Sequence, residues 1–265
     1  MTRQSLFCAT AVILFIAGCE QSGRSSSGPC EFWNKGDRAM VTVRGERLPE
    51  CRRIEAPETP FTAQGQEPAW QLRITDQTIE LTENYGTRQL SFPHAEPTIS
   101  GGIVHYRTTN DDHELEIFIE PSICRDIMSG MPYPATVRYA LDGEMSNGCG
   151  GAPEDLLLGG EWRVSSIAGE PVLENAAPTI EFVAEDSRVA GQTGCNRFTG
   201  KFELTGEGLN FSSLGTTMMA CAGPGVQEQE SRFVEAMQKT FRFEAPAFDR
   251  LHLVTSDGEI IEASR

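Results

Sequence analysis

The segment QTGCNRFTG, Gln192–Gly200, decides how the C-terminal half of the chain is interpreted. It places Cys195 between a glycine and an asparagine, in a stretch typical of a turn. A cysteine there can be a nucleophile, a soft metal ligand or one half of a disulfide. The flanking segments RVAGQTG and KFELTG are typical of β-strands. The choice between the three roles therefore depends on the compartment and on the other cysteines.

Further strands and one helix are predicted around this turn. TIEFVAE and LNFSSLG are typical of strands, and LHLVTSDGEIIEAS predicts a hairpin with a two-residue turn at Asp257-Gly258. A helix is predicted after Pro224-Gly225, with Glu228 and Glu230 in its first turn, where the helix dipole favours negative charge. Helical spacing relates Val226, Glu230, Phe233, Met237 and Phe241, and Val234 and Ala236 widen the apolar stripe.

Residues 30–150 alternate between apolar and polar side chains, a pattern that predicts strands with one face on a core. The core-facing positions are Trp70, Leu72, Ile74, Ile79, Leu81, Val104, Tyr106, Thr108, Leu115, Ile117, Ile119, Val137, Tyr139 and Leu141. We expect an antiparallel meander that closes into a small barrel or sandwich. The segment NGCGGAPEDLLLGGEW, with its glycines and proline, marks the boundary to the second patterned region.

The first 18 residues are typical of an export signal. Arg3 precedes an apolar run from Leu6 to Ile16 that is too short for a stable membrane span. The run ends in Ile-Ala-Gly-Cys19, which resembles the lipobox of bacterial lipoproteins, where the cysteine is diacylated and becomes the mature N-terminus. Residues 19–29 are small and polar and predict a flexible tether.

This N-terminus predicts a location in the bacterial cell envelope. Acyl chains on Cys19 would hold the protein at a membrane surface, after handling by the lipoprotein processing and sorting machinery. Glu20 follows the cysteine, and the absence of an aspartate there favours the outer membrane, facing the periplasm.

The composition limits the partners. With 22 basic and 38 acidic side chains the formal net charge is −16, and such a surface repels nucleic acid and anionic lipid headgroups. We therefore expect no nucleic-acid binding. An acidic surface is compatible with a basic protein as a partner.

Six cysteines remain once Cys8 leaves with the signal and Cys19 takes lipid. They are Cys30, Cys51, Cys124, Cys149, Cys195 and Cys221, and an even number in an exported chain predicts disulfides. No two of them have the C-x-x-C spacing of a zinc ribbon or of a thioredoxin-like redox motif.

From Leu158 onward the chain resembles the META domain, the family of the bacterial heat-shock lipoprotein HslJ. Four motifs carry the resemblance in the family's order: Leu158-x-Gly160-x-Trp162 with Ile167 and Gly169, GQTGCNRFTGKF, TMMAC, and Glu230-x-x-Phe233-x-x-Ala236-Met237. Phe202 stands where the family often has tyrosine. The resemblance implies a compact domain of antiparallel strands with one helix, and an association with envelope stress. It implies no catalytic residue.

The preceding region resembles a module of uncharacterised bacterial envelope lipoproteins. The shared residues are Gly65-x-Glu67-Pro68-x-Trp70, Cys124-x-Asp126-x-Met128-Ser129-Gly130, Tyr133-Pro134 and Gly148-Cys149-Gly150, with Ala69 where an aromatic is common. This resemblance implies a module and no function.

Two domains restrict how the cysteines can pair. Cys195 and Cys221 are the two cysteines of the second domain, so we expect them to be bonded, with a gain of about 3 kcal/mol from closing the loop. By the same locality we pair Cys124 with Cys149 and Cys30 with Cys51. Cys195 is then half of a disulfide.

Other roles for these residues are weighed against structural ones. Met218, Met219 and Cys221 are soft donors for Cu(I), but methionines at alternating strand positions are more often core, and copper would require an unpaired Cys221. Trp70, Trp162 and Asn196 could line a binding surface. The tryptophans begin strands and are expected to fill cores, while Asn196 suits a left-handed turn.

Catalytic signatures are weak. His94, His105, His113 and His252 have neither H-x-H nor H-E-x-x-H spacing, and the chain has no G-x-S-x-G. Asp126 is expected to be a turn or cap residue. We expect no cofactor and no metal.

The sequence thus predicts a mainly β, α+β protein. Its parts are a signal (1–18), a tether (19–29), a disulfide-bonded β module (30–150), a linker (151–157) and a META-like domain (158–265). The expected function is non-enzymatic support of envelope integrity or stress tolerance through binding. The alternatives are an inhibitor of a secreted enzyme such as lysozyme, which would be basic, and an unrecognised hydrolase.

Overall fold

The computed structural model describes residues 23–27, 30–35, 38–43, 46–47, 51–52, 54–206 and 208–265. The described residues up to Glu55 and those from Ala56 to Arg265 form two separate units. The first unit is a small antiparallel sheet of β1 (Gly23–Ser27), β2 (Cys30–Lys35), β3 (Arg38–Val43), β4 (Glu46–Arg47) and β5 (Cys51–Arg52). Strand β1 lies in the predicted tether and pairs with β2.

The single module predicted over 30–150 is therefore divided, because its first strands belong to the smaller unit. Cys30 and Cys51 lie in β2 and β5, and their side chains, like Cys19 and the export signal, lie outside the described part of the chain.

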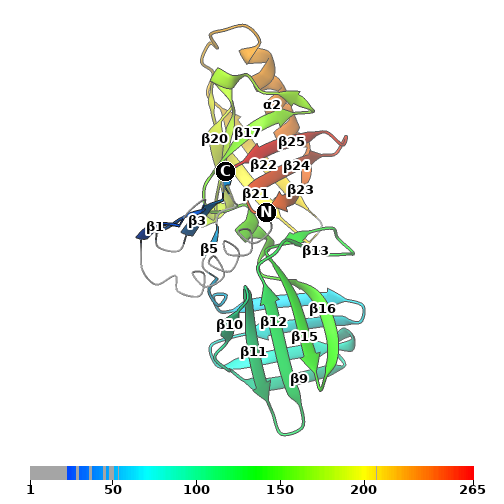
Figure 1. Cartoon of the computed structure of the whole chain (residues 1–265). Helices are drawn as coiled ribbons and strands as arrows, with labels where there is room; N and C mark the ends of the chain where they lie inside the picture. The colour runs from blue at the N-terminus through cyan, green and yellow to red at the C-terminus, as the bar shows by residue number, and fades with distance from the viewer. Residues whose placement is uncertain are drawn as a thin grey trace. The chain divides into compact units, whose positions relative to one another are not determined.

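The larger unit begins with a nine-stranded antiparallel sheet, which is called the first sheet from here on (Figure 1). Its order is β10-β11-β12-β15-β16-β6-β7-β8-β9. Its strands are β6 (Phe61–Gln66), β7 (Ala69–Ile74), β8 (Thr78–Glu83), β9 (Arg88–Pro93), β10 (Thr98–Ser100), β11 (Ile103–Thr109), β12 (Glu114–Glu120), β15 (Ala135–Leu141) and β16 (Glu144–Gly150). Every core-facing position predicted from the alternation is buried, so the sheet curls around the core that the sequence indicates.

The curl of the first sheet brings its last strand, β9, beside β11. β10 pairs with β11 only from Ile103 to His105. Beyond that point, Thr108 Oγ1 donates to the Pro93 carbonyl (2.8 Å) and Asn110 Nδ2 to the Ser91 carbonyl (3.2 Å). The seam between these two strands is thus joined by side chains.

A second antiparallel sheet follows, in the order β22-β21-β20-β19-β17-β25-β24-β23, with β18 on β17. Its strands are β17 (Glu161–Ile167), β18 (Glu170–Pro171), β19 (Thr179–Val183), β20 (Arg188–Gln192), β21 (Arg197–Leu204), β22 (Leu209–Thr216), β23 (Thr240–Ala247), β24 (Arg250–Thr255) and β25 (Ile260–Ser264). The α-helix of the described residues, α2 (Val226–Lys239), packs against this sheet, with Phe233 edge-on to Phe198 at 5.7 Å between ring centroids. The mainly β fold with one helix is confirmed.

Two local predictions for this region, the end of the helix and the length of the last hairpin turn, were wrong. The helix ends at Lys239 because Thr240 is extended and begins β23, so Phe241 lies on a strand and is exposed. The turn between β24 and β25 has three residues, since Thr255 N donates to the Glu259 carbonyl. In the predicted linker, Leu156 and Leu157 are buried in the core of the second sheet.

Two short strands, β13 (Cys124–Arg125) and β14 (Pro132–Tyr133), pair outside both sheets.

No helix among the described residues combines the length and the apolar character that crossing a bilayer requires.

Candidate functional site

The turn between β20 and β21 holds the sequence GCN in a conformation that few residues allow. Gly194 has φ +100°, and a Cβ there would lie 2.2 Å from the Ala176 carbonyl oxygen. Both the backbone angle and the close approach require glycine. Thr193 Oγ1 accepts a hydrogen bond from Asn196 N (2.9 Å), which closes the turn.

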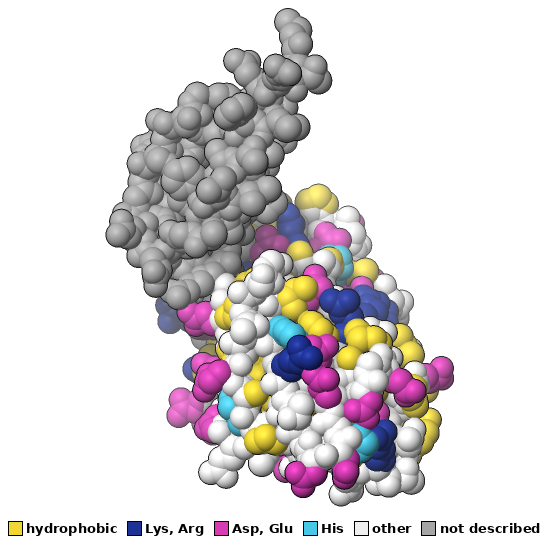
Figure 2. All heavy atoms as spheres, turned by 60° about the horizontal axis from the view of Figure 1, so that its bottom comes forward, with side chains coloured by type: hydrophobic (Ala, Val, Ile, Leu, Met, Phe, Trp, Pro, Cys, Tyr) yellow, Lys and Arg dark blue, Asp and Glu magenta, His cyan; other side chains and the backbone are white. Residues whose placement is uncertain are grey.

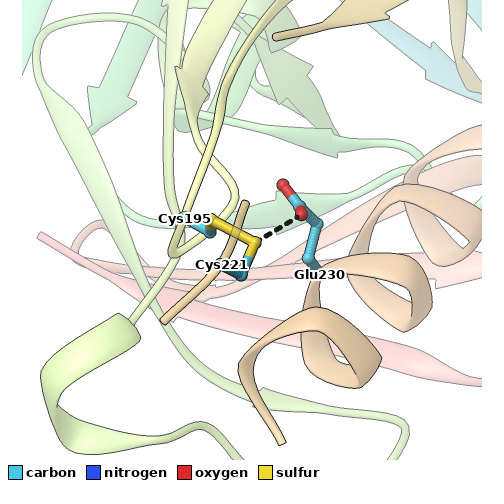
Figure 3. Close-up of side chains that lie close together, drawn as sticks. All are labelled: Cys195, Cys221 and Glu230. Atoms are coloured by element: carbon cyan, nitrogen blue, oxygen red, sulfur yellow. Dashed lines mark hydrogen bonds between the residues drawn. A yellow bond between two sulfur atoms is a disulfide. The ribbon is translucent and has the colours of Figure 1, made fainter. Parts of the chain in front are cut away.

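The disulfide predicted at this turn is formed. Cys195 and Cys221 are bonded, so the turn is joined to the segment that leads into α2 (Figure 3). Glu230 on the helix points toward this bridge, with its Oε2 3.2 Å from Cys221 Sγ. Thr193 Oγ1 contacts the other carboxylate oxygen of Glu230. The strand, the loop and the helix therefore meet at one carboxylate.

Asn196 is buried at the centre of this site and uses both ends of its carboxamide. Its Oδ1 accepts from Met219 N (2.7 Å) and Thr217 Oγ1 (2.8 Å). Its Nδ2 donates to Glu230 Oε2 (3.1 Å) and to the Met219 carbonyl (3.3 Å). A carboxamide offers two donors and one acceptor oxygen, so Asn196 is fully engaged in fixing the loop.

The same residues form a group with metal-ligand chemistry. One atom each from Cys195, Cys221 and Glu230 lies within 4.8 Å of the others. Soft-metal binding by cysteine needs thiolates, and the closed disulfide occupies both sulfurs. Met218 and Met219 were predicted to be core residues on a strand, but β22 ends at Thr216 and both methionines are exposed, Met218 at 97%.

A second cluster surrounds the disulfide between Cys124 and Cys149, which joins β13 to β16. Trp70 lies beside it against two glycines: a Cβ on Gly65 or Gly148 would lie within 2.6 Å of the indole ring. The motif glycines thus make room for the tryptophan, whose ring packs edge-on against Tyr139 at 4.9 Å.

Asp126 holds the turn between β13 and β14, as predicted for a turn residue. Its Oδ1 accepts from Met128 N (3.1 Å) and from Ser129 N and Oγ (2.8 and 2.9 Å). Gln66 Nε2 donates to Oδ2 at 3.0 Å. Burial by itself raises the pKa of Asp126, but the hydrogen bonds from Ser129, Gln66 and Met128 outweigh it and lower that pKa below the usual value. The turn presents Ile127 and Met128 to solvent, 75% and 73% exposed.

The residues suggested for a binding surface lie inside the protein. Trp70, Trp162 and Asn196 are 3%, 1% and 4% exposed. They lie in three places: Trp70 in the core of the first sheet, Trp162 in that of the second with its Nε1 donating to the Leu157 carbonyl (2.8 Å), and Asn196 at the GCN turn.

Two histidines lie beside acids, His105 with its Nε2 3.6 Å from Glu116 Oε1, and His113. His113 Nδ1 is 2.6 Å from Asp142 Oδ2, and its Nε2 is 3.4 Å from Arg88 Nη2. Since a guanidinium only donates, Nε2 faces it as an acceptor and Nδ1 carries the proton. Arg88 continues to Glu83 (3.1 Å), which accepts from Tyr139 Oη (2.7 Å). Burial raises the pKa of Tyr139 to about 12, so its hydroxyl remains a donor. The Nε2 lone pair points at a cation, where a hydrolase triad needs a nucleophile.

Sequence reasoning missed the polar partners at both clusters. Thr193 lies inside the segment Gln192–Gly200 and Gln66 inside the Gly65-x-Glu67 motif, but their contacts with Glu230 and Asp126 were not predicted. Glu230 was singled out for its helical spacing and as the first residue of a META motif, and its contacts with the turn were not predicted.

The second sheet and its site define a class: an antiparallel β domain with one packed helix and a disulfide that joins a turn to the segment before the helix. Residues 155–265 match the model of the META domain family. This match confirms the resemblance for the C-terminal part of the chain.

The solved structures include an NMR structure of a protein from Burkholderia xenovorans, 27% identical, which covers 42% of this chain and 83% of that one with a TM-score of 0.35. A second NMR structure, also 27% identical, covers 42% and 93% with the same TM-score. A comparison with curated proteins gives no match.

Proposed function

We propose that this protein is a lipid-anchored, non-enzymatic protein of the bacterial cell envelope, at the outer membrane facing the periplasm, which supports envelope integrity or stress tolerance through binding. The observation that carries the proposal is the pair of closed disulfides, Cys124–Cys149 and Cys195–Cys221. Such bonds persist in oxidising compartments outside the cytosol. The META match and the lipobox-like segment before Cys19 agree with that compartment.

The non-enzymatic part of the proposal rests on how the motif residues are used. Asn196 is saturated by bonds that fix a loop, and Glu230 accepts from the turn and from Asn196. On the face drawn in Figure 2, basic and acidic side chains are interspersed, which supports leaving nucleic acid out as a partner.

The test is peptide-mapped mass spectrometry of the protein isolated from membranes, with thiols alkylated before and after reduction. We expect a diacylated Cys19, and Cys195 alkylated only after reduction. A Cys19→Ala variant should leave the membrane fraction and fail to restore growth of a deletion strain under envelope stress. An unacylated wild-type N-terminus, or full restoration by Cys19→Ala, contradicts the anchored function.

A second candidate function, inhibition of a secreted basic enzyme such as lysozyme, has its own support. The turn Asp126–Gly130 is braced by a buried carboxylate and by the neighbouring disulfide, and it exposes Ile127 and Met128. A fixed loop with exposed apolar side chains can enter an enzyme cleft with little ordering cost. The acidic chain would attract a basic enzyme.

Lysozyme turnover assays with the purified protein test this candidate. Inhibition should weaken with added salt and fall at least tenfold in Met128→Asp, while Met145→Asp, which changes another exposed methionine on β16, should leave it unchanged. Equal effects of the two variants would count against the loop.

A further inference from the structure

A hollow of about 350 Å³ lies on the outer face of the first sheet, over β6, β7 and β8. Its size falls at the lower end of the range for small-molecule sites, roughly 300–1,000 Å³. The polar side chains that line it include Gln64, Gln71, Arg73, Glu80, Thr82 and Tyr133. Its base is rigid, because Cys149 of the disulfide and the strand residues Ala63 and Leu72 also line it.

The polar groups of this hollow are largely unused by the fold. Arg73 and Glu80 are opposite each other in the register of β7 and β8, yet neither forms an ion pair or side-chain hydrogen bond with the described residues. The same holds for the side chain of Gln71. The side-chain bond present is from Gln64 Nε2 to Tyr133 Oη (2.9 Å), which leaves the Gln64 oxygen and the phenolic proton for another partner.

The charges in the hollow cancel. Arg73 supplies one positive charge and Glu80 one negative charge, while the other polar side chains of the lining are carboxamides, hydroxyls and a phenol. Burial, and the nearby Asp126, raise the pKa of Tyr133, so its hydroxyl stays a donor at neutral pH. The net charge of −16 on the whole chain would repel an anion, and the charge of Arg73, the one arginine of the lining, is already balanced by Glu80. An apolar ligand would leave the donors and acceptors without partners, which costs binding energy.

A neutral ligand that carries many hydroxyl groups satisfies these conditions, because each hydroxyl both donates and accepts. Guanidinium, carboxylate and carboxamide groups can each bond two neighbouring hydroxyls in one plane. We propose that the hollow on β6–β8 binds a neutral saccharide, held by Arg73, Glu80 and Gln71. This inference rests on the proposed binding function and names the ligand class for it.

The experiment is isothermal titration of the full chain, purified in a detergent without a sugar headgroup, with two tetrasaccharides. One is the tetramer of N-acetylglucosamine, which carries acetamido groups, and the other is maltotetraose, which carries hydroxyls alone. Binding of at least one of the two sugars is expected. The sugar that binds more tightly shows whether the natural ligand carries acetamido groups or hydroxyls alone.

Matched variants locate the binding. Arg73→Ala and Gln71→Ala should each weaken the affinity about tenfold, which is about 1.4 kcal/mol. Both side chains are exposed, so the fold should be retained, and far-UV circular dichroism checks this. Arg163→Ala removes an exposed arginine from the second sheet and should change nothing.

Two results would overturn the proposal: no heat of binding for either sugar at millimolar concentration, or binding that is equal in wild type, Arg73→Ala and Gln71→Ala. Because anchoring and the stress phenotype are measured separately on Cys19, a failure here leaves the proposed function standing. A loss of the stress phenotype leaves sugar binding to be judged by the titration alone.

Discussion

The two disulfides of the larger unit have almost the same span, 25 and 26 residues, and each has a buried polar side chain beside it. Asp126 stands two residues after Cys124, and Asn196 directly follows Cys195. Asp126 Oδ1 and Asn196 Oδ1 each accept a hydrogen bond from a backbone N–H of a loop. One group is a carboxylate and the other a carboxamide, so the same fixing of a loop is achieved with a charged and with a neutral side chain.

The difference follows from what each side chain faces. Asp126 is surrounded by donors, from Gln66, Met128 and Ser129, and a negative charge is favourable there. Asn196 must also donate to Glu230, and a second carboxylate in its place would face the first. The neighbour therefore decides whether the loop-holding residue can carry charge.

Exchanging the two chemistries should have the largest effect at Asn196. Asn196→Asp removes the donor to Glu230 and places two carboxylates together in a buried site, so we expect a loss of about 3–5 kcal/mol at pH 7. Urea unfolding measures it. Asn210→Asp, at an exposed position on β22, is the matched control and should change stability little. A similar loss of unfolding free energy in Asn210→Asp would show that the added negative charge destabilises the protein wherever it is placed, and not because of the Asn196 site.

Removing the disulfides should cost nearly equal amounts. The paired changes Cys124→Ala with Cys149→Ala, and Cys195→Ala with Cys221→Ala, should each lower the free energy of unfolding by about 3 kcal/mol, since the closed loops are of similar length. Urea unfolding of both double variants gives the comparison. A difference above about 2 kcal/mol would mean that the native surroundings, and not the loop, set the stabilisation.

The pH dependence should separate the two sites. Asp126→Asn should destabilise by about 1–2 kcal/mol at pH 7, because bonds to a charged acceptor are stronger than those to a neutral one. The lowered pKa means that this contribution is present above pH 3.8 and is lost as the pH falls through the folded-state pKa. Unfolding curves at pH 7 and pH 2.5 measure the difference between variant and wild type. Asp111→Asn, at an exposed loop position, serves as the control, and a difference that persists unchanged at pH 2.5 would contradict the charge argument.

The smallest expected difference is in the rate at which the two disulfides are reduced. In Cys124–Cys149 one partner is 4% exposed, Cys149, and only Cys124 is partly exposed, whereas Cys195 and Cys221 are both partly exposed at the end of a loop. Dithiothreitol should therefore reduce Cys195–Cys221 before Cys124–Cys149 in the native protein, because attack on a disulfide needs access to a sulfur. Alkylation over time with peptide mapping gives the order, and the reverse order would show that local opening controls access.

The sequence predicted most of what depends on short-range pattern. Alternation from Trp70 to Leu141 identified the core of the first sheet, and helical spacing located α2. It could not predict that β6 pairs with β16, because that register joins Gln64 to Cys149 across 85 residues of chain.

The sites show the same limit. The GCN turn and the pairing of its cysteine follow from local sequence and from cysteine number. The contacts of Thr193 and Asn196 with Glu230 depend on how the helix lies against the turn, so tertiary packing decides them. Met218 and Met219 were misjudged although Gly215 stands three residues before Met218, since β22 passes through this glycine and ends at Thr216.

The seam between β9 and β11 has a consequence for how copies of this protein behave when crowded. An unpaired strand edge invites a strand from a neighbouring chain, which is a route to aggregation. Here the carbonyls of Ser91 and Pro93 are already occupied by Asn110 and Thr108, and Pro93 has no N–H to offer. The first sheet thus protects its edge without a continuous ladder, and it could part along this line and close again while all its strand pairs stay intact.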